Sequence, residues 1–403
     1  SALCLTSIIQ ACIERLPALA KSMLQLAAVI GYDFNLHLLK QIALQIDMKP
    51  ETSFEAAFAS SIEALQQTSL VQQQNFHPTS SYCFRHELIR DAIYQNIPTA
   101  QRQINHETVG TAIEQCYGEQ LFEQATTLAH HYVKSARQDK AATYSLLAGD
   151  HAAYHGAHID AIVYYEQALS IAQTLPNSAD AQQLQIDAYI KLAANATDNS
   201  TLEHQQHRLE HARILAADLQ DKQRLTQVLY WLGHLRYNYG DMATALIYVE
   251  RSLNIADQLG DETLMIAPIN LTGRIAWFQT DYERASHMLM RSAEQMRAFG
   301  NQVEEANALG FAGWACACLG DFTRAEDYSQ QSLALTRALY TPAAQAASYM
   351  YCGAVYDQRG DWSQALSAYA EAERLAQLNA DKFRIYLIKC LQGRAYSCLL
   401  YTS

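Results

Sequence analysis

Residues 313–325 read Gly-Trp-Ala-Cys-Ala-Cys-Leu-Gly-Asp-Phe-Thr-Arg-Ala, and the pattern of this stretch returns every forty residues. Its first glycine recurs at Gly233, Gly273, Gly313, Gly353 and Gly393. Seven residues further along stand Gly240-Asp241, Thr280-Asp281, Gly320-Asp321 and Gly360-Asp361, and the closing alanine recurs at Ala245, Ala285, Ala325 and Ala365. A fixed period of this length is typical of a repeat array.

The repeated residues are those that pack two helices together. A glycine in the first helix lets the second helix approach closely, and the Gly-Asp turn ends one helix and caps the next. Because one helix pair cannot bury its apolar face alone, successive pairs are expected to stack into an α-solenoid. The sequence predicts pairs at 138–155/158–174, 182–198/202–219, 223–239/242–259, 262–279/282–299, 302–319/322–339 and 342–359/362–378, and 382–397 begins another.

The first 97 residues follow a different pattern. Apolar residues at helical spacing predict helices over 19–30, 36–45, 54–69 and 87–97. Residues 71–74 and 82–84, joined by a turn at 75–81, predict a β-hairpin. The fold class is therefore all-α with one small β-hairpin. We interpret it as a winged-helix module over 1–97, a helical connector over 98–137 with helices at 100–117 and 120–136, and a repeat array over 138–403.

The two ends of the chain suggest a fragment. The chain begins with Ser1 and not with Met, so we expect it to be cut from a longer protein. The period predicts Gly-Asp at 400–401, where the sequence has Leu400-Tyr401. The last six residues resemble adaptor-derived read-through, and we draw no functional conclusion from them.

Composition narrows the possible partners. The net charge is −12, from 29 basic and 41 acidic residues, which opposes binding to DNA or anionic lipid. The helix predicted at 54–69 contains no Lys or Arg but does contain Glu55 and Glu63, so it is a poor reader of a DNA groove. No apolar run reaches the roughly 18 residues of a membrane span. Nine cysteines without a Cys-x-x-Cys pair indicate reduced thiols and a cytoplasmic location. We expect neither a nucleic-acid nor a membrane partner.

The repeated pattern resembles the tetratricopeptide repeat, lengthened by a few residues per unit, over roughly 138–397. The front of the chain resembles the region after the ATPase core in bacterial STAND-type signalling ATPases, which are linked to nucleotide cyclases or protein kinases. Ile-Glu-Arg-Leu-Pro at 13–17 and Leu-Gln-Leu-Ala-Ala-Val-Ile-Gly at 24–31 carry this resemblance. Phe-Arg-His-Glu-Leu-Ile-Arg-Asp-Ala-Ile-Tyr at 84–94 is similar to their winged-helix signature, and Arg102 and His106 fit the helix that follows.

This resemblance implies a non-catalytic sensing arm whose winged helix contacts an upstream ATPase domain. ATP or ADP and Mg²⁺ belong to that domain, because this chain has no Gly-x-x-x-x-Gly-Lys motif and needs no cofactor of its own. It also implies that His86, with Arg85 beside it, faces bound ADP. The alternative is that His86 caps the next helix and Arg85 pairs with Glu87 or Asp91.

The inner face of the array is the candidate binding groove. Tyr230, His234 and Tyr237 lie on one helical face, and one period later the same places hold Asn270, Arg274 and Trp277. The next period gives Gly310, Trp314 and Ala317. Aromatic side chains beside Arg and Asn suit a peptide or protein ligand. The alternative is that these aromatic residues only pack between helices.

Metal and catalytic sites are not expected. His151, His155 and His158, and likewise His204, His207 and His211, have helical spacing, but neither set has a nearby Cys or matches His-Glu-x-x-His. His155 and His158 also lie on either side of the turn at Gly156. The sequence contains no nucleophile elbow and no Gly-rich phosphate loop, so we do not expect an enzyme.

The leading hypothesis is the sensing arm of a multidomain signal-transduction ATPase. Its repeat groove would bind a peptide, protein or inducer, and its winged helix would couple that event to nucleotide state. The alternatives are a stand-alone scaffold for protein interaction and the sensor part of a STAND-type transcription activator. A Walker A motif upstream would support the first hypothesis, and a basic helix-turn-helix downstream would indicate the activator.

Overall fold

The computed structural model describes residues 12–46, 51–74, 81–195, 202–379 and 381–402. They fall into two compact units, 1–197 and 198–403, and each is described by itself. This division into two units does not test the predicted domain boundaries at residues 97 and 137, which remain predictions. No helix of the described residues is long and apolar enough to cross a membrane.

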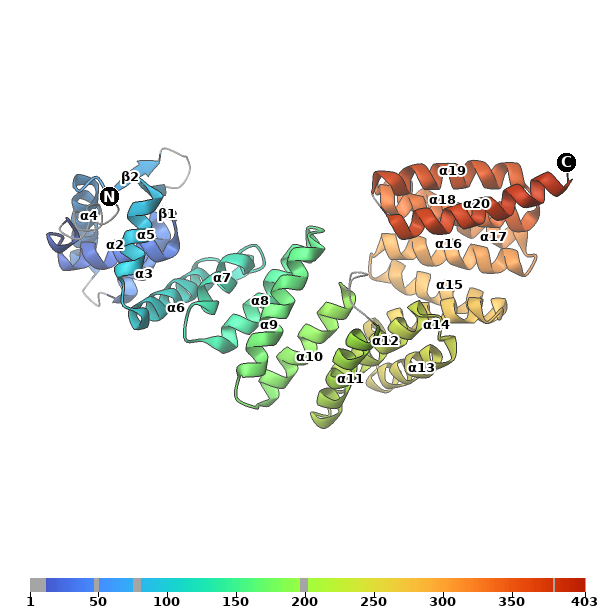
Figure 1. The fold of residues 1–403 in the computed structure, drawn as a ribbon, viewed down its shortest axis with the longest axis horizontal. Coiled ribbons are helices and arrows are strands. Elements are labelled where there is room, and N and C mark those ends of the chain that lie inside the picture. Colours follow the sequence, from blue (N-terminus) through green and yellow to red (C-terminus); the bar gives the residue numbers. More distant parts are fainter. Residues whose placement is uncertain (1–11, 47–50, 75–80, 196–201, 380, 403) are drawn as a thin grey trace. The chain divides into compact units, whose positions relative to one another are not determined.

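The first unit begins with helices around a small antiparallel sheet (Figure 1). Its elements are α2 (Ala18–Ile30), β1 (Asp33–Asn35), α3 (Leu36–Ile46), α4 (Glu51–Gln67), β2 (Val71–Gln74), β3 (Ser81–Phe84) and α5 (Glu87–Asn96). The strand order is β1-β3-β2, with Phe34 opposite Tyr82 and Gln72 opposite Cys83. The order of helices and hairpin strands agrees with the prediction, whereas β1 is an additional strand. The predicted hairpin turn falls largely at 75–80, outside the described residues.

The core of this region is formed by apolar side chains from most of its elements. Met23 and Leu24 of α2, Leu39 of α3, Phe54 of α4 and Phe84 of β3 are completely buried. Burial of each such side chain contributes about 1.5–3 kcal/mol. This core fixes the start of α5, where His86 lies.

The connector differs from its prediction. It consists of α6 (Thr99–Cys116), a 3-10 turn η1 (Gly118–Gln120) and α7 (Ala125–Val133). The second predicted helix, over 120–136, is wrong in its first turn and at its end. The main chain makes the 3-10 bond Gln120 N–H to Tyr117 O and then runs through turns until Ala125. Three helices complete the first unit: α8 (Gln138–Tyr154), α9 (His158–Thr174) and α10 (Ala179–Ala194).

The second unit is a stack of helices that follow each other as pairs (Figure 1). They are α11 (Leu202–Asp218), α12 (Lys222–Asn238), α13 (Met242–Leu259), α14 (Glu262–Phe278), α15 (Tyr282–Ala298), α16 (Gln302–Cys318), α17 (Phe322–Ala338), α18 (Pro342–Arg359), α19 (Trp362–Leu378) and α20 (Lys382–Thr402). The prediction of repeated helix pairs is confirmed. The last helix is longer than predicted and continues past residue 397, because no glycine follows there to end it.

The recurring glycines pack as expected. A Cβ atom added at Gly233 would lie 2.5 Å from Val249 Cγ2, and one added at Gly313 would lie 2.9 Å from the backbone oxygen of Ala325. These glycines therefore set how closely the second helix of each pair can approach. A Cβ atom at Gly393 would meet nothing within 4 Å.

The turn between paired helices also follows the sequence. Gly240, Gly320 and Gly360 have left-handed φ angles of 82°, 80° and 88°, and Thr280 takes the same conformation at 63°. The aspartates that follow accept hydrogen bonds from backbone N–H groups three residues on, as Asp241 does from Thr244. Asp361 differs, because its side chain does not cap α19 and its carboxylate accepts from Arg359 instead.

Candidate functional site

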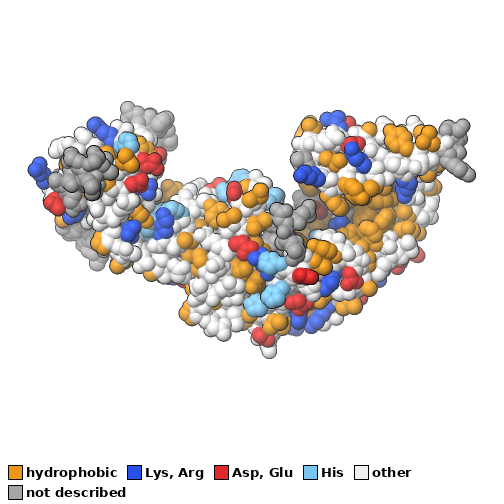
Figure 2. Space-filling model, in the orientation of Figure 1, with side chains coloured by type: hydrophobic (Ala, Val, Ile, Leu, Met, Phe, Trp, Pro, Cys, Tyr) orange, Lys and Arg blue, Asp and Glu red, His pale blue; other side chains and the backbone are white. Residues whose placement is uncertain are grey.

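A pocket of about 190 Å³ lies on the inner face of the second unit. The first helices of four successive repeats, α14, α16, α18 and α20, line it with Asn270, Arg274, Glu304, Asn307, Phe311, Met350, Tyr351, Phe383, Arg384 and Leu387. We call this lining the inner pocket. Figure 2 shows hydrophobic side chains gathered on the part of the second unit where α16 and α20 lie. Asn270 and Arg274 were predicted for the groove, and the other eight were not.

Packing positions the aromatic wall of the inner pocket. Gly310 has no side chain, and a Cβ atom there would lie 2.4 Å from Cδ2 of Tyr351. The Tyr351 ring therefore lies flat against α16, stacked on Phe311 with ring centroids 5.7 Å apart. Burial raises the pKa of Tyr351 above its ordinary value, so its hydroxyl is neutral and available for hydrogen bonding.

Arg274 is the charged centre of the inner pocket. Its guanidinium lies over the ring of Tyr237, 4.9 Å from the ring centroid. Within the described parts of the chain it forms no ion pair, whereas Arg384 in the same pocket is paired with Asp381 at 3.0 Å. Burial, with the Arg274 cation as the second cause, lowers the pKa of His234 to about 4, so this imidazole is neutral at pH 7.

The predicted groove residues divide into two groups. Tyr230, His234 and Tyr237 lie along one face of α12, and Tyr237 reaches the inner pocket through Arg274. Trp277 and Trp314 instead pack against each other, with ring centroids 4.4 Å apart. Trp314 is only 7% exposed, and neither indole lines the inner pocket. These two tryptophans therefore contact each other and lie outside the lining of the inner pocket.

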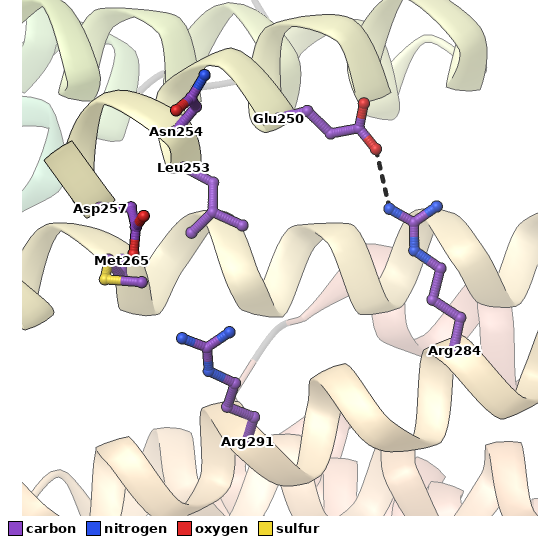
Figure 3. Close-up of a pocket in the computed structure, with 7 residues that line it drawn as sticks. All are labelled: Glu250, Leu253, Asn254, Asp257, Met265, Arg284 and Arg291. Carbon is purple, nitrogen blue, oxygen red and sulfur yellow. Dashed lines mark hydrogen bonds and ion pairs between the residues drawn. The ribbon is translucent and has the colours of Figure 1, made fainter.

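A second hollow, of about 320 Å³, lies between the second helices α13 and α15 (Figure 3). Glu250 and Arg284 form an ion pair of 2.9 Å at one end, and Arg291 points into the space from the α15 side. The cation at this end is already neutralised. Arg291 has no ion pair among the described residues, but the residues that line this hollow include no aromatic side chain. The inner pocket, where Phe311 and Tyr351 lie beside Arg274, is the better candidate for ligand binding.

In the first unit, His86 begins α5 as its N-cap. Its Nδ1 accepts a hydrogen bond from the Leu88 backbone N–H at 3.2 Å, and the side chain is exposed. This is the capping role that the sequence left open for it. The accompanying ion pair was wrong: Asp91 pairs with Arg90 at 3.3 Å, and in the described residues Arg85 is exposed and forms no ion pair.

A buried chain of hydrogen bonds, which we call the relay, joins α5, α6 and α7 through Tyr94, His106 and His131. The Tyr94 hydroxyl is 2.9 Å from Nε2 of His106, and Nδ1 of His106 is 3.0 Å from Nδ1 of His131. Both imidazoles are 1% exposed. Burial, followed by the charges of neighbouring basic groups, lowers the pKa of each histidine to about 3. Both are therefore neutral at pH 7, and one Nδ1 donates to the other.

Three cations surround the tyrosine of this relay. Arg90, Arg102 and Lys134 lie 5.7, 5.4 and 5.7 Å from the Tyr94 ring centroid. Arg90 also lies four residues after His86, one helical turn further along α5. This part of the first unit is thus locally positive in a chain of net charge −12. From the sequence, the resemblance included Arg90, Tyr94, Arg102 and His106. It did not include His131 and Lys134, which come from a helix some 25 residues further along the chain.

Comparison with known proteins identifies the repeat. The family model for the tetratricopeptide repeat matches residues 266–338 and 304–377. A curated relative is an uncharacterised protein of Rhizobium meliloti (strain 1021), 27% identical over 173 residues. The match covers 43% of this chain and 16% of that protein, so the chain represents a small part of its length. The tetratricopeptide prediction is therefore confirmed for residues 266–377, which lie within the predicted array.

Solved structures share this architecture. A Signal Transduction ATPase with Numerous Domains protein with a tetratricopeptide repeat sensor, from Pyrococcus horikoshii, aligns with a TM-score of 0.66 at 13% identity. The alignment covers 97% of this chain and 55% of that one, so this chain spans about half its length. A Rap protein complexed with Competence and Sporulation Factor aligns with a TM-score of 0.49 at 9% identity, over 78% of this chain and 93% of that one. At 13% identity the likeness to the Pyrococcus horikoshii structure is one of fold.

Proposed function

We propose that this chain is the sensing arm of a multidomain signalling ATPase of the STAND type. The inner pocket binds a peptide or an extended protein segment, and the winged-helix region over 1–97 couples this binding to nucleotide state. The observation that carries the proposal is a pocket lined by four successive repeats around Arg274, which forms no ion pair within the described residues. The shared fold with a STAND protein that has a tetratricopeptide sensor supports this arrangement of parts.

The size of the inner pocket favours an extended ligand. Pockets that enclose a whole small molecule usually measure roughly 300–1,000 Å³. The 190 Å³ measured here accommodates one or two side chains. A peptide that lies along the groove and inserts one anchor residue fits this volume better than an enclosed metabolite.

The lining specifies the chemistry of the peptide. Phe311, Met350 and Leu387 provide an apolar surface for the anchor side chain. The amides of Asn270 and Asn307 each offer a donor and an acceptor, which suits a peptide backbone. Arg274 offers a cation for a carboxylate on the ligand. We therefore expect a peptide with an apolar residue close to an acidic group.

The first unit provides the coupling end of the proposal. His86 is exposed at the N-terminus of α5, where backbone N–H groups favour an anion. Arg102 adds positive charge over the Tyr94 ring, and Arg90, which is paired with Asp91, lies over the same ring. A nucleotide phosphate held by an upstream ATPase domain would be attracted to such a surface. In this proposal ATP or ADP and Mg²⁺ belong to that upstream domain.

Selection of a random-peptide library on the immobilised chain tests the groove. Selected peptides should bind with an affinity that falls at least about tenfold in Arg274→Ala, because a charged hydrogen-bond partner is lost. Phe311→Ala should weaken the same peptides by removing the apolar wall. Arg291→Ala is the matched control, since it changes an arginine in the second hollow, between α13 and α15. Equal loss in Arg291→Ala, or none in Arg274→Ala, would contradict the inner pocket as the binding site.

The stand-alone scaffold remains the second candidate, because the repeat match covers residues 266–377 and assigns no family to the front of the chain. The sensor of a STAND-type transcription activator is a variant of the leading proposal. The uncut reading frame separates the three. A Walker A motif upstream supports a signalling ATPase, and a basic helix-turn-helix downstream supports the activator.

A further inference from the structure

Three metal-ligand side chains meet at the end of α8 in the first unit. His151 lies in the last turn of α8, His155 is its C-cap, and Glu123 lies in the turn that precedes α7. One ligand atom from each residue lies within 4.8 Å of the other two. His151 Nε2 is 3.4 Å from an Oε2 atom of Glu123. Other groups of three His, Cys, Asp or Glu side chains in the described residues do not meet this spacing.

Local structure explains why this set differs from the one that the spacing suggested. His151 and His155 are four residues apart on a helix, so their rings share one face, with centroids 4.6 Å apart. Gly156 then takes a left-handed φ of 77° and turns the chain away. His158 starts α9, and its Nδ1 is 3.0 Å from Oδ1 of Asn195. His158 is thus engaged elsewhere, and Glu123 from a distant segment takes the third position.

Aromatic rings hold the two imidazoles in place. Phe122 lies 5.2 Å from the His151 ring, and Tyr154 lies 5.2 Å from the His155 ring. Phe122 and Tyr154 also contact each other edge to face at 5.8 Å. These contacts restrict how the imidazoles can turn, which lowers the entropy lost when they bind an ion. The Glu123 side chain is 64% exposed and free to adjust its position.

We propose that Glu123, His151 and His155 bind a divalent transition-metal ion of the zinc class. Two imidazole nitrogens and one carboxylate oxygen form a ligand set that such ions accept, whereas Ca²⁺ and Mg²⁺ prefer oxygen ligands throughout. Bonds of about 2.0–2.2 Å place neighbouring donors roughly 3.3–3.6 Å apart in a tetrahedral site. The 3.4 Å between His151 Nε2 and Glu123 Oε2 already lies in this range, and a ring nitrogen of His155 lies within 4.8 Å of the ligand atoms of both residues. A fourth position stays open for water or another ligand.

The ion would fasten two parts of the first unit together. Residues 118–124 form the irregular stretch between α6 and α7, and Glu123 lies near its end. The histidines belong to α8. A bound metal therefore cross-links this stretch to the end of α8, and it stabilises the folded state by the free energy of binding.

Titration of the tag-free, metal-stripped full chain with ZnCl₂ and with CoCl₂ tests the site. We expect one site per chain, and Co²⁺ should give a visible absorption band without the near-ultraviolet band of thiolate ligation. The absence of the near-ultraviolet band distinguishes this site from Co²⁺ bound by the free cysteines. His155→Gln and Glu123→Gln should each weaken binding at least about tenfold, because each removes one of three ligands.

The matched controls are His158→Gln and His207→Gln, which change histidines of similar spacing outside the proposed set. Both should bind Zn²⁺ with the affinity of the unmodified chain. Zn²⁺ should also raise the melting temperature of the unmodified chain and of His158→Gln, but not that of His155→Gln. The proposal is overturned if the chain binds no Zn²⁺ or Co²⁺, or if binding is unchanged in both His155→Gln and Glu123→Gln. Thiolate-type Co²⁺ absorption would overturn it equally.

Discussion

The neutral pair His106 and His131 makes the first unit sensitive to acid. In the unfolded chain each histidine titrates near its ordinary pKa of about 6.5. In the folded chain burial lowers both pKa values to about 3. Between these values the unfolded state binds more protons, so the free energy of unfolding falls as the pH decreases from 6.5 toward 3. Above pH 6.5 the contribution of the pair is fully present.

We predict that stability falls by up to about 1.4 kcal/mol per pH unit for each histidine in this window. Urea unfolding followed by circular dichroism at pH 7.5, 6 and 5 measures the slope. His106→Gln should lower stability at pH 7.5 because it disrupts the relay, and it should flatten the slope between pH 6 and 5. His151→Gln, outside the relay, should keep the slope of the unmodified chain. An unchanged slope in His106→Gln would show that the pair is not the source.

At the scale of the element, the helix pair depends on contact at its glycine. A Cβ atom at Gly313 would lie 2.9 Å from the backbone oxygen of Ala325 and 3.2 Å from the backbone nitrogen of Ser329. Backbone atoms cannot move aside as a flexible side chain can. Gly313→Ala should therefore force α16 and α17 apart and cost about 1–3 kcal/mol, even though alanine favours helix formation.

Gly393→Ala is a matched control for this prediction. The residue has the same position in the period and also lies within a helix, but no atom lies within 4 Å of its added Cβ. Its substitution should be neutral or should stabilise by up to about 1 kcal/mol. Urea unfolding of the two variants measures the difference. Equal effects would mean that the glycines act through helix propensity and not through the contact between helices.

The same elements show what the sequence can predict. The helix pairs of the second unit follow from glycine, aspartate and alanine at fixed places, because these residues act through contacts within one repeat. Strand β1 was not foreseen, since its three residues contain a single buried apolar side chain, Phe34, and cannot show an alternating pattern. The start of α7 was misplaced because no capping side chain marks it, and Gln124 makes no capping hydrogen bond.

At the scale of the whole molecule, the binding groove could be predicted only in part. Repeating the α14 positions by forty residues leads to Gly310 and Trp314, whereas the inner pocket uses Asn307 and Phe311 of α16. Positions that are equivalent in the repeat therefore do not all face the groove. The forty-residue spacing alone cannot show which positions face it. The sequence also did not predict the Glu123–His151–His155 set. Glu123 lies 28 residues before His151, so local spacing in the sequence does not bring the two together.

The last prediction concerns the proposed multidomain ATPase, here called the parent, and rests on the proposed coupling. If peptide binding in the groove and nucleotide binding shift the same two-state equilibrium, each ligand must change the affinity for the other by the same factor. A peptide selected on the inner pocket should then bind the ADP-loaded and ATP-loaded parent with affinities that differ by roughly 5- to 150-fold. Fluorescence anisotropy of the labelled peptide measures both values.

Two variants separate the two ends of this coupling. Arg274→Ala should weaken the peptide in both nucleotide states, because it acts at the groove. His86→Ala should reduce the difference between the states while leaving the affinity of the present chain for the peptide unchanged, because His86 lies in the first unit, at the start of α5. Arg85→Ala removes the positive charge next to His86 but keeps the α5 cap. Comparing the two variants therefore separates the effect of losing the cap from the effect of losing positive charge. Equal peptide affinities in the ADP and ATP states of the unmodified parent would contradict the coupling, and the groove would then be an independent interaction site.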